Sequence, residues 1–260
     1  MSMNQSVLIC DQVNPVLNEI LEKNGLQITY EPEITPEQIQ NKIENFEVVI
    51  VRSRTKITKD MIDKATKCQI IARVGVGLDN IDQAAAKEKN IRVINAVEGA
   101  MNAVAELVIG LMLSLAREIP RADREVRNGN WIKKELMGTE LRGKYLGIVG
   151  LGNIGKRLGR LARALNMNII GYDVVPIDEE FSKEVGLMKA DLGTLLASSD
   201  YVSLHVPLLD STKHLINAEK MSTMKNTSRI INTSRGGVID EGALYEFLKD
   251  GKLGGAALDV

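Results

Sequence analysis

Short apolar runs alternate with amphipathic segments along the whole chain. In the first part, runs rich in Val and Ile are bounded by turn residues, which is the pattern of buried β-strands. We predict five strands there, at residues 7–10, 26–30, 48–51, 69–74 and 91–94. A helix is expected to begin after Thr35, because this capping residue is followed by Pro36 and then by Gln38.

The same alternation starts again at Tyr145, after an apolar helix expected at 102–117 and a second helix at 119–128. We predict further strands at residues 145–149, 168–172, 201–205, 228–232 and 255–258, with a short one near 187–189. Strands that alternate with helices form parallel sheets covered on both faces. The predicted fold class is therefore α/β, with two parallel-sheet domains at 1–97 and 98–260, the first of them flavodoxin-like.

The turn GLGNIG at residues 150–155 lies between an apolar strand and a helix, and the next strand ends in Asp173. Gly150 permits a tight turn, Gly152 removes a side chain where a pyrophosphate must approach, and Gly155 allows close helix packing. The helix N-terminus offers free N–H groups to the phosphates. This segment predicts a Rossmann dinucleotide-binding domain.

Asp173 is expected to select the cofactor. Its carboxylate can accept hydrogen bonds from both ribose hydroxyls and would repel a 2′-phosphate. Val174, Val175 and Pro176 follow it, so no nearby cation could hold such a phosphate. NAD is favoured over NADP, and the alternative reading of Asp173 is an exposed turn residue.

Composition narrows the function classes. The 33 basic and 34 acidic residues nearly cancel, so no nucleic-acid partner is expected. Cys10 and Cys68 have no metal-ligand spacing and fit a reducing, cytoplasmic location. The longest apolar stretch, 103–116, contains Glu106 and is shorter than a bilayer span, so no membrane association is expected.

Ligands of α/β sheets bind beyond the carboxyl ends of the strands. His205, Val206 and Pro207 close one predicted strand, and Thr233, Ser234 and Arg235 follow the next. The planar guanidinium of Arg235 suits the carboxylate of a 2-keto acid, which it can grip through two hydrogen bonds. The alternative is a salt-bridged surface arginine.

In the first domain, Gly75 and Gly77 leave backbone N–H groups where an anion could dock. Arg52, Arg54 and Arg73 lie at strand ends of the same domain. Together they form a candidate receptor for a substrate with more than one negative charge. Ordinary turn glycines and solvated arginines would explain the same pattern.

Taken together, these motifs resemble the D-isomer-specific 2-hydroxyacid dehydrogenases. The matching segments are VRSRTKIT at 51–58, VGVGLDNID at 74–82, MGTEL at 137–141, GLGNIG at 150–155, HVPL at 205–208, TSRG at 233–236 and GAALD at 255–259. The resemblance implies a substrate-binding domain and an NAD-binding domain, with the active site in the cleft between them. It also implies a homodimer built on helix 102–117 and the following segment with Trp131.

The resemblance further assigns roles to individual residues. It implies that Arg235 is catalytic and that the substrate is bound by Arg52, Ser53, Arg73, Val76 and Gly77. The cofactor-binding residues it implies are Gly150, Gly152, Asn153, Ile154, Gly155, Asp173, His205, Val206, Pro207, Thr233, Ser234 and Asp259. No metal is implied.

The expected reaction is the NAD-dependent oxidation of 3-phosphoglycerate to 3-phosphohydroxypyruvate, the entry step of serine synthesis. A family member that reduces glyoxylate or hydroxypyruvate is the nearer alternative. In the family, a His that donates the proton and its supporting Glu lie beyond the segment that ends here at Val260, so we expect this chain to be a fragment. His205 and His214 are poor substitutes for that acid. An NAD-sensing binding module is the further alternative if Val260 is the true terminus.

Overall fold

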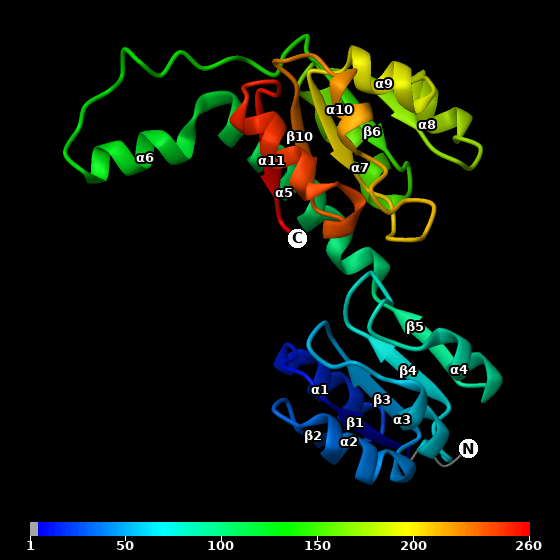
Figure 1. Ribbon diagram of the computed structural model, residues 1–260. Helices are drawn as coiled ribbons and strands as arrows, with labels where there is room; N and C mark the ends of the chain where they lie inside the picture. The colour runs from blue at the N-terminus through cyan, green and yellow to red at the C-terminus, as the bar shows by residue number, and fades with distance from the viewer. Residues whose placement is uncertain (1–4) are drawn as a thin grey trace. The chain divides into compact units, whose positions relative to one another are not determined.

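The computed structural model describes residues 5–260, apart from the side chains of residues 97 and 98. Contacts within the chain divide it into two compact units, Met1–Ala100 and Met101–Val260, here called the first and second units (Figure 1). Each unit is built on a single parallel sheet.

The sheet of the first unit has the flavodoxin-like order β2-β1-β3-β4-β5. Its strands are β1 (Ser6–Ile9), β2 (Gln27–Tyr30), β3 (Val48–Val51), β4 (Ile70–Arg73) and β5 (Arg92–Asn95). Every pairing is parallel. The predicted fold class is confirmed, and the observed strands differ from the predicted ones by no more than a residue at either end.

Helices cover both faces of this sheet. They are α1 (Pro15–Lys23), α2 (Pro36–Lys42), α3 (Lys59–Lys64) and α4 (Gln83–Glu88), with a 3₁₀ turn at Ile43–Asn45. Leu8 and Val49 point into one buried cluster, whereas Ile9 and Ile50 point into the other, as the two-residue period of a strand requires. At the start of α2, the Thr35 side chain accepts from the Gln38 N–H and the Gln38 side chain accepts from the Thr35 N–H, which confirms the capping box.

The second unit has a six-stranded sheet in the order β11-β10-β9-β6-β7-β8. Its strands are β6 (Tyr145–Val149), β7 (Asn168–Tyr172), β8 (Met188–Lys189), β9 (Tyr201–Leu204), β10 (Arg229–Asn232) and β11 (Gly255–Leu258). The chain runs from β6 outward through β7 and β8, then returns to the other side of β6 with β9. The crevice between the ends of β6 and β9 is therefore the topological switch point, where Rossmann folds bind their ligands.

Two buried clusters lie on opposite faces of the second sheet. Ile148 and Ile231 join the cluster that includes helices α5 and α7, whereas Val149 and Ile230 join the cluster beneath α9, α10 and α11. The helices of this unit are α5 (Val97–Arg117), α6 (Ile119–Arg127), α7 (Asn153–Ala164), α8 (Glu179–Val185), α9 (Leu192–Ser198), α10 (Ala218–Ser222) and α11 (Glu241–Lys249).

Helix α5 begins earlier than predicted, at Val97, and is 21 residues long. By length and composition its window Gly99–Arg117 could cross a membrane, so the expectation that this segment is too short is wrong. The indication is weak, because the core helix of a soluble protein passes the same test. One face of α5 packs into the core of the second unit through Ala105, Val108, Met112 and Ala116.

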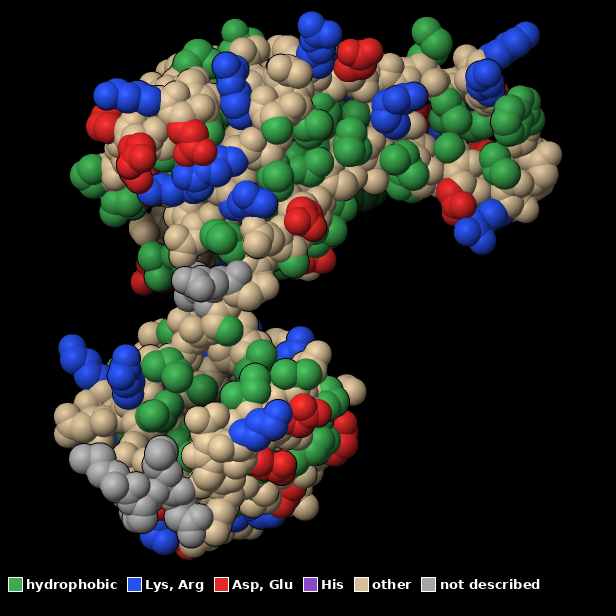
Figure 2. All heavy atoms as spheres, turned by 180° about the vertical axis from the view of Figure 1, so that it is seen from behind, with side chains coloured by type: hydrophobic (Ala, Val, Ile, Leu, Met, Phe, Trp, Pro, Cys, Tyr) green, Lys and Arg blue, Asp and Glu red, His purple; other side chains and the backbone are tan. Residues whose placement is uncertain are grey.

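Helix α6 and the irregular segment after it extend away from the sheet of the second unit (Figure 1). No described side chain of α6 is buried, and Trp131 and Met137 are 79% and 83% exposed. Hydrophobic side chains lie among charged ones along this projection (Figure 2). The segment returns to the body where the Thr139 N–H donates to the Ala116 carbonyl at 2.8 Å. We call residues 119–138 the arm.

Candidate active site

In the turn between β6 and α7, Gly150 and Gly155 are tightly packed, whereas Gly152 faces open space. Gly150 has φ +93°, and a Cβ there would lie 2.7 Å from the His205 carbonyl oxygen. A Cβ on Gly155 would lie 2.1 Å from the Gly150 carbonyl oxygen, so only glycine fits. A Cβ on Gly152 would meet nothing within 4 Å. This open space, with α7 beginning at Asn153 beside it, fits a pyrophosphate at a helix N-terminus.

Asp173 lies beside this turn at the end of β7. One of its carboxylate oxygens accepts from the Leu151 N–H at 2.6 Å, and the other accepts from the Val175 N–H at 3.1 Å. Each oxygen still has a lone pair for a ribose hydroxyl. The carboxylate is thus held in position before any ligand arrives, as NAD recognition requires.

The ends of the three central strands lie level with one another. Val149 pairs with Leu204, and Leu204 pairs with Asn232. Gly150, His205 and Thr233, the residues that follow these ends, are therefore neighbours at one edge of the sheet.

A hollow of about 310 Å³ opens beside Gly150 and Gly152. The predicted residues that line it are Gly150, Gly152, Asp173, His205, Val206 and Pro207. Sequence reasoning missed the rest of the lining, which is Tyr172, Val174, Leu209, Ser211, Thr212 and Leu215. Most of these lie on an irregular loop after Pro207, which carries no sequence motif. The apolar wall and the carboxylate together suit the adenosine part of a dinucleotide.

The turn after β10 carries Thr233, Ser234 and Arg235. The Thr233 hydroxyl oxygen is buried and has no hydrogen-bond partner among the described residues, so it is available to a ligand. Arg235 donates from its guanidinium to the Ser234 carbonyl at 2.6 Å. Just after the adjacent strand β11, the Asp259 N–H donates to the Asn232 carbonyl at 3.0 Å.

His205 is held in its neutral form. Its Nε2 lies 2.8 Å from the Ser203 hydroxyl, and burial lowers the pKa of the imidazole to about 4. Protonation would place a charge in this enclosed position, which the site disfavours. His205 is therefore a wall of the hollow and a poor proton donor at neutral pH.

In the first unit, the loop after β4 has the form of an anion receptor. Arg73 donates to the Gly77 carbonyl, and the Asn95 side-chain amide donates to the Val76 carbonyl at 2.5 Å. Among the groups that the structure describes, which leave out the side chains of residues 97 and 98, none accepts a hydrogen bond from the N–H groups of Val76 and Gly77. Two side chains therefore hold the carbonyls and leave the N–H groups available.

The three arginines of the first unit do not act alike. The Arg54 guanidinium donates to Asp11, which is 2% exposed, and to the carbonyls of Cys10, Pro32 and Ile34. Arg54 thus ties strand ends together and does not fit the expected receptor for a polyanion. Arg52 is exposed and donates to the Gln12 carbonyl at 3.0 Å, which leaves further N–H donors for a ligand.

Arg52 and Ser53 line a hollow of about 220 Å³ with Arg54 and Asp11. The Asn80 amide donates at 2.6 Å to the carbonyls of both Arg52 and Thr55, which joins this loop to the one carrying Val76 and Gly77.

Sequence reasoning had assigned no role to Asp11, Asn80 or Asn95. A usable signal existed for Asp11 and Asn95, since both are polar residues at the carboxyl end of a strand.

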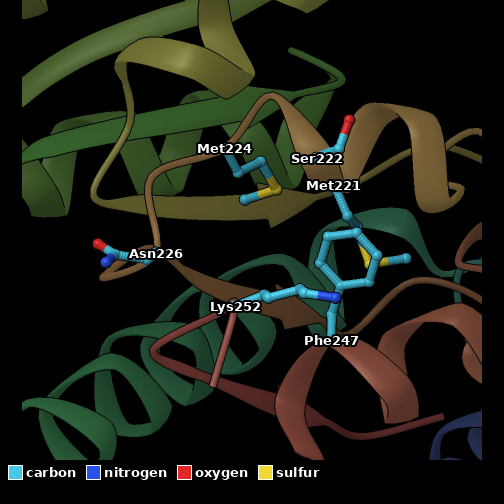
Figure 3. A pocket seen from close by; sticks show the side chains of 6 residues that line it. All are labelled: Met221, Ser222, Met224, Asn226, Phe247 and Lys252. Atoms are coloured by element: carbon cyan, nitrogen blue, oxygen red, sulfur yellow. The ribbon is translucent and has the colours of Figure 1, made fainter. Parts of the chain in front are cut away.

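Elsewhere on the second unit, a hollow of about 350 Å³ lies between α10 and α11, and Figure 3 shows the side chains that line it. It is lined by Met221, Ser222, Met224, Asn226, Phe247 and Lys252. None of the predicted site residues lies in it. Among the described residues there is also no group of His, Cys, Asp and Glu that could hold a metal ion.

The chain is similar to known proteins in both sequence and structure. The model of the family "D-isomer specific 2-hydroxyacid dehydrogenase, NAD binding domain" matches residues 109–260. D-3-phosphoglycerate dehydrogenase of Methanocaldococcus jannaschii is 45% identical over 255 residues, which are 98% of this chain and 48% of that protein. Hydroxypyruvate reductase of Thermotoga maritima is 45% identical over 241 residues, which are 93% of this chain and 77% of that protein.

The chain is also similar to solved structures of 2-hydroxyacid dehydrogenases and related reductases. A glyoxylate reductase from Paecilomyes thermophila superposes with a TM-score of 0.90 at 30% identity, covering 99% of this chain and 81% of that one. The apo D-lactate dehydrogenase of Escherichia coli gives 0.84 at 30% identity, covering 98% and 82%. The chain spans about half the length of the D-3-phosphoglycerate dehydrogenases that it matches.

Replacing Gly152 or Gly155 by alanine should affect different properties, namely cofactor binding and thermal stability. We expect Gly152→Ala to leave thermal stability within experimental error and to weaken NADH binding about tenfold or more, because its methyl group would occupy the open space. Gly155→Ala should lower the melting temperature, because its Cβ collides with backbone. Thermal unfolding and NADH fluorescence titration of both variants test this. Equal loss of stability in the two would contradict the assignment of the open space to a ligand.

The half-buried imidazole of His205 should make the protein sensitive to acid. Its pKa is about 4 in the folded chain and about 6.5 when unfolded. As pH falls from 6.5 to 4 the unfolded state takes up the proton first, so the free energy of unfolding should drop by up to about 3 kcal/mol. His205→Gln should remove most of this slope, whereas His214→Gln should keep it. Urea unfolding across this pH range measures both, and an unchanged slope in His205→Gln would refute the assignment.

Proposed function

Because the chain belongs to the D-isomer-specific 2-hydroxyacid dehydrogenases and carries their NAD-binding domain, we propose that it interconverts a 2-hydroxy acid and its 2-keto acid. NAD is the cofactor. The observation that carries the proposal is that Arg235 lies in the turn after β10, and that the end of β10 is level with the ends of β6 and β9, which are followed by the glycine turn and by His205. A guanidinium at the edge of a dinucleotide site suits a carboxylate-bearing substrate.

Different residues of the second unit would bind different parts of the cofactor and the substrate. The open space at Gly152 and the first turn of α7 would hold the pyrophosphate, and Asp173 would hold the adenosine ribose. When bound, NAD accepts or gives the hydride at its nicotinamide ring. Arg235 would bind the substrate carboxylate and withdraw electron density from the oxygen at C2. In the first unit, the N–H groups of Val76 and Gly77 would donate hydrogen bonds to an anionic group.

We propose 3-phosphoglycerate as the hydroxy acid and 3-phosphohydroxypyruvate as its product. The support is the 45% identity to a D-3-phosphoglycerate dehydrogenase over nearly the whole chain, together with the exposed guanidinium of Arg52 in the first unit. Reduction of hydroxypyruvate is the second candidate, since a hydroxypyruvate reductase is equally identical and is covered over 77% of its length.

Arg235 provides the direct test of the proposed reaction. We expect Arg235→Lys to lower kcat/KM for the keto acid by a hundredfold or more, because an ammonium cannot form the planar pair of hydrogen bonds. NADH binding should change little, since Arg235 is assigned to the substrate. Assays of NADH oxidation with phosphohydroxypyruvate and titration with NADH give the two values. If Arg235→Lys keeps most of the activity, the bidentate role is wrong.

Arg52 discriminates between the two substrates. Loss of a hydrogen bond to a charged group costs about 1.5–3 kcal/mol, so Arg52→Ala should lower kcat/KM for phosphohydroxypyruvate about tenfold or more. The loss for hydroxypyruvate, which has no phosphate, should be much smaller. Lys56→Ala removes a cation from the same loop and serves as the control. Equal losses with both substrates would argue against phosphate recognition by Arg52.

We also propose that the protein is a homodimer. Helix α5 keeps Leu107 and Leu113 about 40% exposed on the side away from its buried face, and the arm exposes Trp131 and Met137. A two-fold partner would cover apolar surface of this kind. Light scattering at micromolar concentration should give twice the mass of one chain, and Leu107→Glu combined with Leu113→Glu should shift it toward the monomer. A monomeric mass for the unmodified protein would refute the dimer.

A further inference from the structure

Asn232 is the last residue of β10, and its side chain is bonded entirely to the turn that carries Arg235. The residue is 1% exposed. Its Nδ2 donates to the Arg235 carbonyl at 2.8 Å. Its Oδ1 accepts from the Ser234 N–H at 3.0 Å and from the Ser234 hydroxyl at 2.7 Å. The donor end and the acceptor end of one amide are thus both used on two adjacent residues.

We infer that Asn232 is a positioning residue, which fixes the turn so that the Arg235 guanidinium meets the substrate carboxylate. This inference rests on the proposed function of Arg235. The side chain bonds nothing in the glycine turn, and β10 pairs with β9 and β11 through its backbone. Loss of the Asn232 amide should therefore disturb substrate binding most, while the sheet, the glycine turn and Asp173 persist.

Asn232→Asp keeps the hydrogen-bond acceptor of the side chain and replaces only the donor. Aspartate matches asparagine in size, and one oxygen can still accept from Ser234. The other oxygen would face the Arg235 carbonyl, where it repels when ionised and donates a hydrogen bond only when protonated. Asn232→Asp should therefore restore the turn at low pH and lose it at high pH.

The charged neighbours affect this pH dependence. The backbone N–H of Asp259 donates to the Asn232 carbonyl from the β11 side, and the Glu241 carboxylate lies beside Gly236 in the same turn. His205 follows the β9 residue that pairs with Asn232 and is neutral. Arg235 itself is the cation of the turn. Burial and the Glu241 carboxylate favour the protonated form of an introduced aspartic acid and raise its pKa, whereas the Arg235 cation acts in the opposite direction.

The kinetic test uses Asn232→Asp and Asn232→Ala in the protein that carries this chain, assayed with NADH and phosphohydroxypyruvate from pH 5.5 to pH 9. An unpaired buried group costs enough to predict about a tenfold or greater loss of kcat/KM for Asn232→Asp at pH 8. Relative to the unmodified protein, this loss should shrink as the pH falls, whereas Asn232→Ala should show a loss that does not depend on pH. The Kd for NADH should change less than threefold in both variants.

A double-mutant cycle tests whether Asn232 acts through Arg235. In an Arg235→Lys background, Asn232→Asp should add little further loss, because the group that it positions is already compromised. Full additivity would overturn the inference, as would activity of Asn232→Asp within twofold of the unmodified protein at every pH. Equal losses in NADH binding and turnover would also overturn it, since they indicate a general structural role.

Amide hydrogen exchange tests the inference without turnover. The Ser234 N–H should exchange about tenfold faster or more in Asn232→Asp than in the unmodified protein at pH 8, while Ile230 and Ile231 in β10 stay protected. Unchanged exchange at Ser234 would refute the role of Asn232. If the unmodified protein reduces no 2-keto acid, the proposed function fails. The exchange rate of the Ser234 N–H then still tests whether Asn232 fixes the turn.

Discussion

The close approach of Gly155 to the Gly150 carbonyl is the contact on which the second unit depends. No side chain fits between them, so α7 starts against the end of β6. This start places the first N–H groups of α7 at the switch point of the sheet. It also brings the Leu151 N–H to within 2.6 Å of the Asp173 carboxylate, which comes from the next strand. Phosphate and ribose recognition thus share one geometric origin.

Side-chain amides perform a comparable task in both units. Asn95 holds the Val76 carbonyl in the first unit, and Asn232 holds the Arg235 carbonyl in the second. In each case an amide at the end of a parallel strand fixes the backbone of a loop. The group assigned to the ligand, an N–H in one unit and a guanidinium in the other, lies next to the fixed carbonyl. A neutral amide suits this role, because it bonds a carbonyl without adding a charge to an anion-binding site.

The sequence predicted the sheets well, because buried parallel strands carry unbroken apolar runs that end at turn residues. Strands β3, β6, β7 and β11 have the predicted bounds. The start of α5 was misplaced by five residues, since residues 97–101 lack the apolar periodicity that marks the rest of the helix. The glycine turn and Asp173 could also be predicted, because local backbone geometry requires particular residue types at these positions.

The remainder of the site could not be read in that way. The loop from Leu209 to Leu215 lines the hollow, but nothing in its residues indicates how it folds back. Arg54 and Arg52 have the same local signature, and only tertiary hydrogen bonds separate a structural tie from an available donor. The neutral state of His205 likewise depends on burial beside Ser203, which sequence spacing does not report.

The two backbone bonds to Asp173 also have a bearing on redesign. Replacing this residue to accommodate a 2′-phosphate would remove a negative charge and at the same time release the N–H groups of Leu151 and Val175. Those donors would need a new acceptor in every state of the protein, including the state without cofactor. A change of cofactor preference in this scaffold is therefore a problem of backbone solvation as much as of charge, and a small hydroxyl or amide side chain at position 173 is better suited to it than an aliphatic one.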